Sequence, residues 1–295
     1  AAGRFVSFGL VAVPLAWMER REFAHYTVKD WIDVSKLGVI GNIAYYWCLI
    51  ECIQNAGVPV AGMAMSAVPV LVAAVSNIRD KKKGTALAWS RLVPGLTLIV
   101  CGFALASMTE FEMVVQASAD GGLKFWYGVM MAVAALLIWT WYPIRNADWL
   151  LAHPDRSPRA WSTAQGLTTF PFAVVMYFFF WGLEPDATPL LGYDPAWFVF
   201  VMVFSGLMGS WVGIVFWNAM SQRLPTALAG QMIVFETIFA VTYAHVLRMQ
   251  WPEWNMLAGM ALLLSGVMLS LKVFSDSQAS VGQNRSDSGK TTTTN

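Results

Sequence analysis

Charged side chains are scarce in this chain of 295 residues. Asp, Glu, Lys and Arg together make up 13% of it, about half of what a soluble domain carries, whereas hydrophobic residues make up 57%. So little polar surface cannot cover a water-soluble globule of this size. A soluble fold is therefore excluded, and an all-α polytopic membrane protein is predicted. The net charge of +1 also excludes a strongly basic nucleic-acid-binding protein.

Metal-ligating and catalytic motifs are also missing. The three cysteines lie in apolar runs, and no second pair joins Cys48 and Cys52 to complete a zinc site. The chain lacks a His-Glu-x-x-His pair, a nucleophile elbow and a Gly-x-x-x-x-Gly-Lys-Ser/Thr phosphate loop. We therefore expect no cofactor, no metal and no enzymatic activity. An integral membrane enzyme, or a structural membrane protein without transport activity, is the alternative.

What the sequence does have is long apolar runs. Nine segments could cross a bilayer as helices of roughly 20 residues, although the first is short. They are 3–18, 35–55, 58–78, 89–107, 123–143, 162–182, 196–221, 225–246 and 254–272. Asn55-Ala56-Gly57 and Arg223-Leu224-Pro225 join neighbouring segments so closely that each predicts a helical hairpin.

Basic residues alternate between the connections, which predicts the orientation of the chain. They follow the first, third, fifth, seventh and ninth segments, whereas the other connections carry mainly acidic residues. The basic residues are Arg20, Arg21, Lys29, Lys36, Arg79, Lys81, Lys82, Lys83, Arg91, Arg145, Arg156, Arg159, Arg223 and Lys272. The C-terminus is therefore expected in the cytoplasm and residue 1 on the opposite side. We also expect at least one further helix upstream of Ala1.

An internal repeat relates the two halves of the chain. Residues 41–77 align with residues 209–245 at an offset of 168, with Gly41 opposite Gly209 and Gln54 opposite Gln222. Each stretch is followed by a helix with two glycines seven residues apart, namely Gly95 and Gly102, then Gly259 and Gly266. Segments one to four thus match segments six to nine. An offset of five crossings inverts one copy relative to the other, as in many secondary transporters.

The chain resembles the drug/metabolite transporter superfamily, in its EamA-type branch of two inverted five-helix repeats. The residues that carry the resemblance are Ala2-Gly3-Arg4-Phe5, Pro69-Val70-Leu71, Arg223-Leu224-Pro225-Thr226-Ala227, Phe235-Glu236 and the paired glycines. Within the branch, the chain looks most like YddG-like exporters of aromatic amino acids. The resemblance implies a ten-helix fold whose first helix is missing from this chain. It implies a first repeat over 1–107 and a second over 123–272. Residues 275–295 are rich in Ser, Thr, Asp and Gln, which predicts a disordered cytoplasmic tail.

The same resemblance implies the function. We expect a secondary transporter that exports amino acids, aromatic or other neutral ones, or related small metabolites by alternating access. The implied localisation is the inner membrane, with several crossings. The implied partners are a small-molecule substrate, membrane lipid and protons as a coupling ion, with no nucleic acid and no required oligomer.

Glu236 is the outstanding candidate residue, because an acidic side chain in the middle of an apolar span should face a cavity or a partner. It could bind a substrate amine or exchange a proton. The alternative is a protonated carboxyl that packs against a neighbouring helix.

Other polar residues in the spans could line a pocket or make interhelical hydrogen bonds. These candidates are Asn42, Tyr46, Gln165, Thr169, Trp217 and Asn218. A second set could let helices bend or slide, or could serve packing alone: Pro69, Gly206, Ser210 and Gly213.

Overall fold

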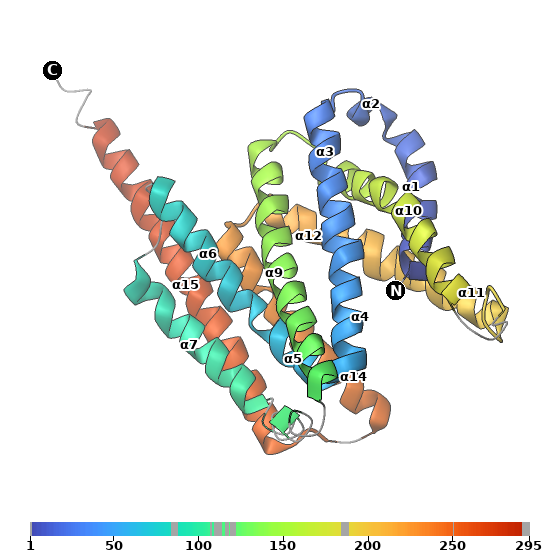
Figure 1. Ribbon diagram of the computed structural model, residues 1–295. Coiled ribbons are helices and arrows are strands. Elements are labelled where there is room, and N and C mark those ends of the chain that lie inside the picture. Colours follow the sequence, from blue (N-terminus) through green and yellow to red (C-terminus); the bar gives the residue numbers. More distant parts are fainter. Residues whose placement is uncertain are drawn as a thin grey trace. The chain divides into compact units, whose positions relative to one another are not determined.

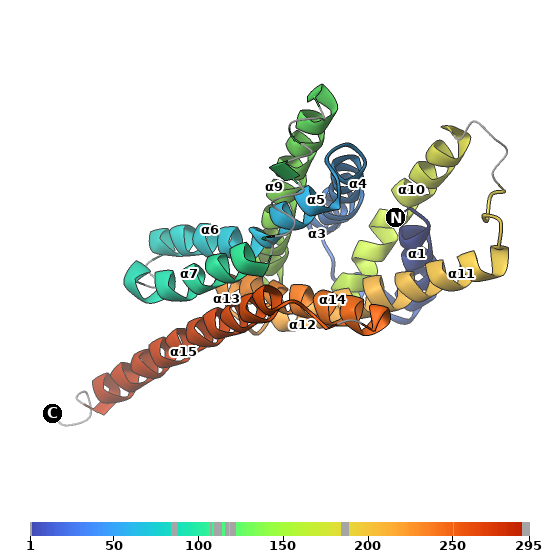
Figure 2. The same cartoon turned by 90° about the horizontal axis from the view of Figure 1, so that it is seen from below.

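The described part of the computed structural model is helical, without strands, and covers residues 2–83, 88–106, 108, 114–115, 118, 122–183, 189–249 and 251–290 (Figures 1 and 2). The elements before residue 107 are α1 (Ala2–Met18), α2 (Arg20–Phe23), α3 (Val28–Lys36), η1 (Leu37–Ala44), α4 (Tyr45–Ala56), α5 (Val58–Ser66), α6 (Val68–Lys83) and α7 (Trp89–Ala106). The later elements are α9 (Gly122–Ala152), α10 (Pro158–Leu183), α11 (Pro195–Phe204), η2 (Ser205–Val212), α12 (Gly213–Ser221), α13 (Thr226–Gln231), α14 (Ile233–Arg248) and α15 (Trp254–Lys290).

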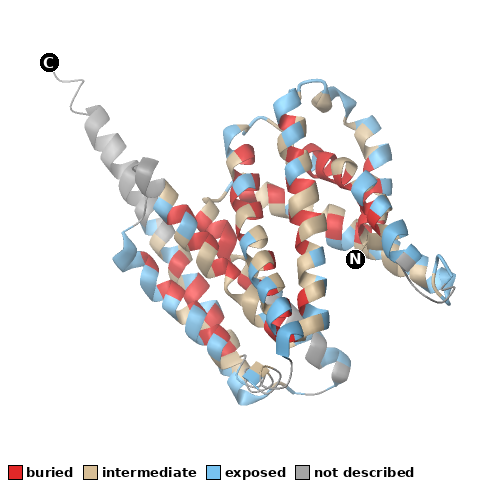
Figure 3. Cartoon of the chain, viewed as in Figure 1, coloured by how far each residue is buried: buried red, intermediate tan, exposed pale blue. Residues whose placement is uncertain are grey.

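Within the described residues, seven helical stretches are long and apolar enough to cross a membrane, and one of them, Val58–Arg79, contains a turn at Ala67. They include seven of the nine predicted segments, and the first predicted segment is the shorter apolar helix α1. Exposed residues occur along the helices (Figure 3). They include large apolar ones such as Val175, Phe179 and Phe216. Such exposure suits a helix surrounded by lipid, so the all-α polytopic fold is confirmed.

The eighth predicted segment, 225–246, is not among these seven stretches. A turn at Met232 divides it into α13 and α14. Gly230, two residues before the turn, lies so close to α6 that an added Cβ would be 2.3 Å from Val72. The third segment is divided in the same way, by a turn at Ala67 between α5 and α6. Pro69 is the second residue of α6, and proline suits the first turn of a helix because its missing N–H is not needed there.

Local sequence explains where several helices begin. Thr27 and Asp30 form a capping box at the start of α3, and the Asp194 side chain accepts a hydrogen bond from the Trp197 N–H in front of α11. Gly57 adopts a φ of 92°, a conformation that favours glycine, and allows the tight reversal between α4 and α5. The predicted reversal at Arg223-Leu224-Pro225 separates α12 from α13. Both predicted connections therefore lie between two helices.

Two helices extend beyond their predicted ends. α9 continues past residue 143 to Ala152, because its last turns bury Leu150 and Trp149 while Arg145 stays at the surface. α15 is helical to Lys290, whereas a disordered tail was expected from residue 275. The chain has no proline after Pro252 to end that helix. Residues 291–295 lie outside the described part.

The chain divides into two compact units that do not coincide with the two halves of the sequence. Unit 1 comprises residues 1–52 and 130–225, and unit 2 comprises residues 53–129 and 226–295. Each unit therefore draws elements from both predicted repeats.

In unit 1, α1 packs along α10, η2 packs against α1, and η1 packs against α10. Phe5 and Phe8 of α1 form one small core with Ala173 of α10. A second core is built around Trp149 and Trp161, whose rings stack with centroids 3.5 Å apart. Unit 1 thus has α1 and α10 at its centre.

In unit 2, α7 and α15 pack tightly through their glycines. A Cβ added to Gly102 would lie 2.8 Å from the Gly259 carbonyl oxygen, and one added to Gly266 would lie 2.7 Å from the Gly95 carbonyl oxygen. The first glycine of one helix thus contacts the second glycine of the other. This pattern is what a two-fold axis between two antiparallel, equivalent helices produces.

Two π-helical segments stand at equivalent positions. η1 covers Leu37–Ala44 and η2 covers Ser205–Val212, so their bounds differ by 168 residues at both ends. This is the offset that aligns the two halves of the sequence. π-Helical turns are rare and occur frequently at functional sites, which directs attention to the surroundings of η1 and η2.

Candidate functional site

An arginine of α1 lies against η2 in unit 1. The guanidinium of Arg4 donates from Nε to the Ser210 hydroxyl at 2.8 Å and from Nη2 to the Gly209 carbonyl oxygen at 3.0 Å. Its Nη1 donates to the Tyr46 hydroxyl of α4 at 2.8 Å. Three hydrogen bonds to acceptors in η2 and α4 therefore fix the orientation of this cation.

Arg4 lies deep in the span even though it is the third residue of α1. Its partners Gly209 and Ser210 are near the middle of the 27-residue apolar stretch Pro195–Ser221. A charged side chain at that depth costs about 2.5–3.5 kcal/mol on insertion scales. No carboxylate of the described residues lies within ion-pair distance of Arg4.

The aromatic rings of Phe5 and Tyr46 lie beside the guanidinium. Its Cζ is 5.6 Å from the centroid of the Phe5 ring and 5.4 Å from that of Tyr46. The two rings meet edge to face, with centroids 5.1 Å apart. The ring faces partly stabilise the cation, and they form an apolar wall beside it.

Small residues allow α1 and η2 to come this close. A Cβ added to Gly206 would lie 2.6 Å from the Cβ of Ser7 and 2.8 Å from the Arg4 carbonyl oxygen. Gly206 and the buried Ser210 therefore form the close helix contact expected from the sequence. Gly213 does not take part, because it is exposed and begins the regular helix α12.

A second polar centre occupies the matching position on α10. A Cβ added to Gly38, which is 168 residues before Gly206, would lie 3.4 Å from the Gln165 carbonyl oxygen and 2.7 Å from the Thr169 hydroxyl. Gln165 and Thr169 of α10 thus approach Gly38 as Arg4 and Phe8 of α1 approach Gly206. The Asn42 amide donates to the Thr169 hydroxyl at 3.1 Å. The close helix approach is therefore similar at Gly38 and Gly206, whereas the hydrogen bonds of the two centres differ.

Buried amides extend this second centre. The Asn146 side-chain oxygen accepts from Gln165 and from the Trp161 indole, both at 2.9 Å, and its amide donates to Asn218 at 2.7 Å. Asn218 in turn donates to the Ser162 hydroxyl at 2.8 Å. Interhelical hydrogen bonds, the alternative considered for Gln165, Thr169 and Asn218, therefore describe their contacts.

The remaining predicted residues lie elsewhere. The indole N–H of Trp217 is buried and has no partner among the described residues. Pro69 is a buried residue of unit 2, at the break between α5 and α6. Glu236 is exposed in the first turn of α14, in unit 2, because the break at Met232 precedes it. Glu236 thus lies near the middle of the predicted segment 225–246, four residues after the break in its helix.

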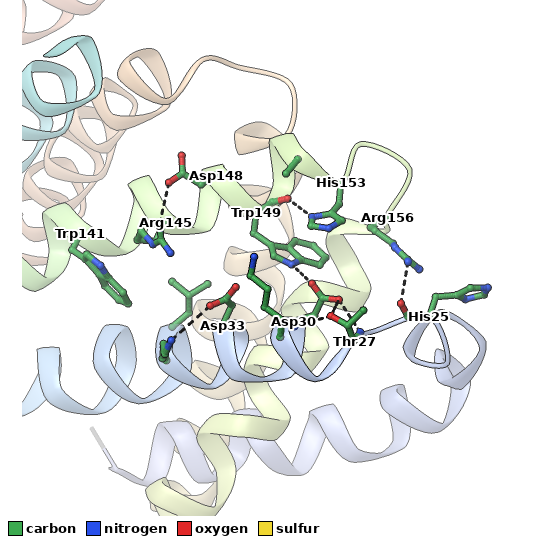
Figure 4. Close-up of a pocket in the computed structure, with 14 residues that line it drawn as sticks. His25, Thr27, Asp30, Asp33, Trp141, Arg145, Asp148, Trp149, His153 and Arg156 are labelled. Carbon is green, nitrogen blue, oxygen red and sulfur yellow. Dashed lines mark hydrogen bonds and ion pairs between the residues drawn. The ribbon is translucent and has the colours of Figure 1, made fainter. Parts of the chain in front are cut away.

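A cavity of about 580 Å³ opens beside α3 and the end of α9 (Figure 4). It is lined by both signs of charge. The Trp149 indole donates to Asp30 at 2.7 Å, and Arg145 lies 3.6 Å from Asp148. Lys36 lies 3.9 Å from Asp33. Two of the cations that line the cavity, Lys36 and Arg145, thus have a carboxylate beside them, whereas Arg4 is held by neutral groups.

Sequence reasoning missed Arg4 and Asn146 as site residues. Arg4 was noted only for the resemblance, although it is the only charged residue within segment 3–18. Asn146 was assigned to a connection because the apolar run ends at residue 143. An isolated charge in an apolar segment was the signal that could have found Arg4. No comparable signal marks Asn146.

Comparisons with known proteins agree with this architecture. The profile of the EamA-like transporter family matches residues 1–108. The Inner membrane protein YtfF of Escherichia coli (strain K12) is 35% identical over 274 residues, which cover 92% of this chain and 85% of that protein. A solved structure described only as "Crystal structure of protein" has a TM-score of 0.67 at 16% identity. It covers 91% of this chain and 85% of its own chain, and that likeness concerns the fold alone.

Proposed function

Because the chain belongs to the EamA-type branch of the drug/metabolite transporter superfamily, we propose that it exports amino acids or related small metabolites across the inner membrane by alternating access. The proposed amino acids are aromatic or other neutral ones. Membership of this family points to a transporter rather than an enzyme. The name of the relative YtfF supports the inner membrane as the location.

One observation carries the alternating-access part of the proposal: the Arg4 site is built from both predicted repeats. Arg4 and Tyr46 belong to the first repeat, proposed to span 1–107, whereas Ser210 belongs to the second, proposed to span 123–272. A site shared by two inverted repeats can open to either side when one repeat moves against the other. The equal offset of η1 and η2 and the reciprocal glycine contacts of α7 and α15 support the inversion.

The broken helices also support a transport function. Breaks at Ala67 and Met232 interrupt the third segment and its repeat partner, the eighth. Discontinuous helices at corresponding positions of two repeats characterise the binding regions of secondary transporters, because the helix ends can contact ions and polar substrates. Glu236, in the first turn after one of these breaks, is the proposed site for a substrate amine or a coupling proton.

The proposal is tested by flux in proteoliposomes that contain the purified chain. Labelled phenylalanine, tryptophan and leucine should cross only protein-containing vesicles, and an imposed proton gradient should change the initial rate by about tenfold. Protein-free vesicles and vesicles with heat-inactivated protein are the controls. Equal fluxes with and without protein, for these and other small metabolites, would contradict a transport function. Turnover of a membrane lipid would favour the enzyme alternative.

A further inference from the structure

We propose that Arg4 binds a carboxylate of the transported molecule, so that the substrates of this protein are small carboxylic acids or zwitterions. This assignment rests on the proposed transport function and names the substrate class of the Arg4 site. The resemblance does not imply it, because the candidate residues taken from the sequence did not include an arginine.

The first argument is the unused donor capacity of the guanidinium. An arginine has five N–H donors, and Arg4 uses three of them, one from each nitrogen. One N–H remains on each terminal nitrogen. These two donors, on neighbouring nitrogens of a planar cation, are available to the oxygens of a carboxylate, the anion that arginine binds most readily through paired hydrogen bonds.

The second argument is the charge. The three groups that hold Arg4 are two hydroxyls and one carbonyl oxygen, all of them neutral. The described residues place no carboxylate within ion-pair distance of the guanidinium. Elsewhere in unit 1, Arg159 has such a partner, since its Nε lies 2.8 Å from a Glu19 oxygen. A substrate carboxylate would supply the negative charge that Arg4 lacks.

The third argument is the open space beside the cation. Gly209 is exposed, and a Cβ added there would have Arg4 atoms alone within 4 Å, Cζ at 3.9 Å and Nη2 at 4.0 Å. An atom can therefore stand in van der Waals contact with the guanidinium without displacing anything. The adjacent rings of Phe5 and Tyr46 form an apolar wall beside the guanidinium that suits an apolar or aromatic substrate body.

A purely structural role for Arg4 makes a different prediction. In that case, the three hydrogen bonds would only hold α1 against η2 and α4. Replacing Arg4 would then lower the stability of the protein by the same amount whichever ligand is present. If Arg4 binds a carboxylate, the protein should also prefer acids over their amides, and this preference should be lost when the guanidinium is removed. Ligand preference, rather than stability alone, therefore separates the two roles.

The test compares matched probes on the purified full chain by thermal shift and calorimetric titration. Phenylalanine, leucine and 3-phenylpropionate are each paired with the corresponding amide. The acids should stabilise the wild type in the thermal shift. The affinity for each amide should be at least about tenfold lower than the affinity for the matching acid. Arg4→Gln should lose this preference, with acid binding weakened roughly ten- to a hundredfold. Arg145→Gln, which removes a cation of the charged cavity, is the matched control and should keep the preference.

Arg4→Lys covers the case in which Arg4→Gln does not fold. Lysine keeps the charge and loses the planar fork, so acid binding should weaken by about tenfold while the preference over amides persists. The proposal is overturned if the wild type binds amides as tightly as acids, if it binds no probe, or if both Arg4 variants bind acids like the wild type. Gradient-driven flux of amides alone would overturn the carboxylate site and leave the transporter function intact. Acid binding that depends on Arg4, without flux of any probe, would support the site and contradict transport.

Discussion

Gly102→Ala should lower the apparent unfolding midpoint by roughly 5 °C or more, because the close contact between α7 and α15 leaves no space for an added methyl group. The new Cβ would lie 2.8 Å from the Gly259 carbonyl oxygen and 2.8 Å from the Leu263 backbone nitrogen. Both neighbours are backbone atoms of α15, so the two helices must move apart. That separation loosens a core that includes Leu92, Ile99 and Leu263. Thermal unfolding of the detergent-solubilised protein measures the effect.

Gly62→Ala is the matched control, because a Cβ added to Gly62 of α5 would meet nothing within 4 Å. The midpoint of that variant should be unchanged or slightly raised, since alanine favours a helix over glycine by about 1 kcal/mol. Equal midpoints for Gly102→Ala and the wild type would show that α7 and α15 do not depend on close glycine contact.

Glu236→Gln should abolish the response of transport to a proton gradient while the protein is still expressed and inserted. Glutamine keeps the size and hydrogen-bonding shape of glutamate but neither ionises nor attracts an amine. Flux in proteoliposomes between about pH 5.5 and 8 should therefore become flat or fall to the background. The measurement is the initial rate as a function of pH and of the imposed gradient.

Glu51→Gln controls for the loss of an acidic side chain from a membrane helix in general. Glu51 lies in α4, toward the end of its apolar stretch, and its removal should leave the pH profile in place. An unchanged rate and pH profile in Glu236→Gln would show that this carboxylate neither binds substrate nor carries a coupling proton.

Hydrophobic runs, turn residues and paired glycines were sufficient to predict most of the fold. Apolar runs located the spans, Gly57 and Pro225 marked the reversals, and the 168-residue offset anticipated the matching positions of η1 and η2. These features are local, or they recur at a fixed spacing, and a sequence displays them directly. The breaks within the third and eighth segments were not predicted as such. The turn at Met232 lies two residues after Gly230, which is in close contact with Val72 of α6, and no local pattern records that tertiary contact.

The candidate site was predicted in part, for a similar reason. Helical periodicity places Asn42 and Gln165 on particular helix faces, but it does not identify the groups that those faces meet. Arg4 has a site only because Gly209, Ser210 and Tyr46 converge on it from segments far along the chain. Asn146 became part of a buried network because α9 continues beyond its apolar run. Interactions between distant segments therefore account for most of what was missed.

Alternating access at the Arg4 site is tested most directly by the accessibility of a thiol introduced with Gly209→Cys. Cys48, Cys52 and Cys101 are first replaced by alanine, and Gly209→Cys then places its thiol beside the guanidinium without a clash. A membrane-impermeant thiol reagent is applied to inside-out and to right-side-out vesicles. Lys29→Cys, which places a thiol in the charged cavity, is the control and should react from one side only.

The account predicts that the thiol of the Gly209→Cys variant reacts from both sides, and that a transported acid changes the two rates by roughly tenfold in opposite directions. Reaction from one side alone under every gradient and substrate condition would contradict alternating access at this site.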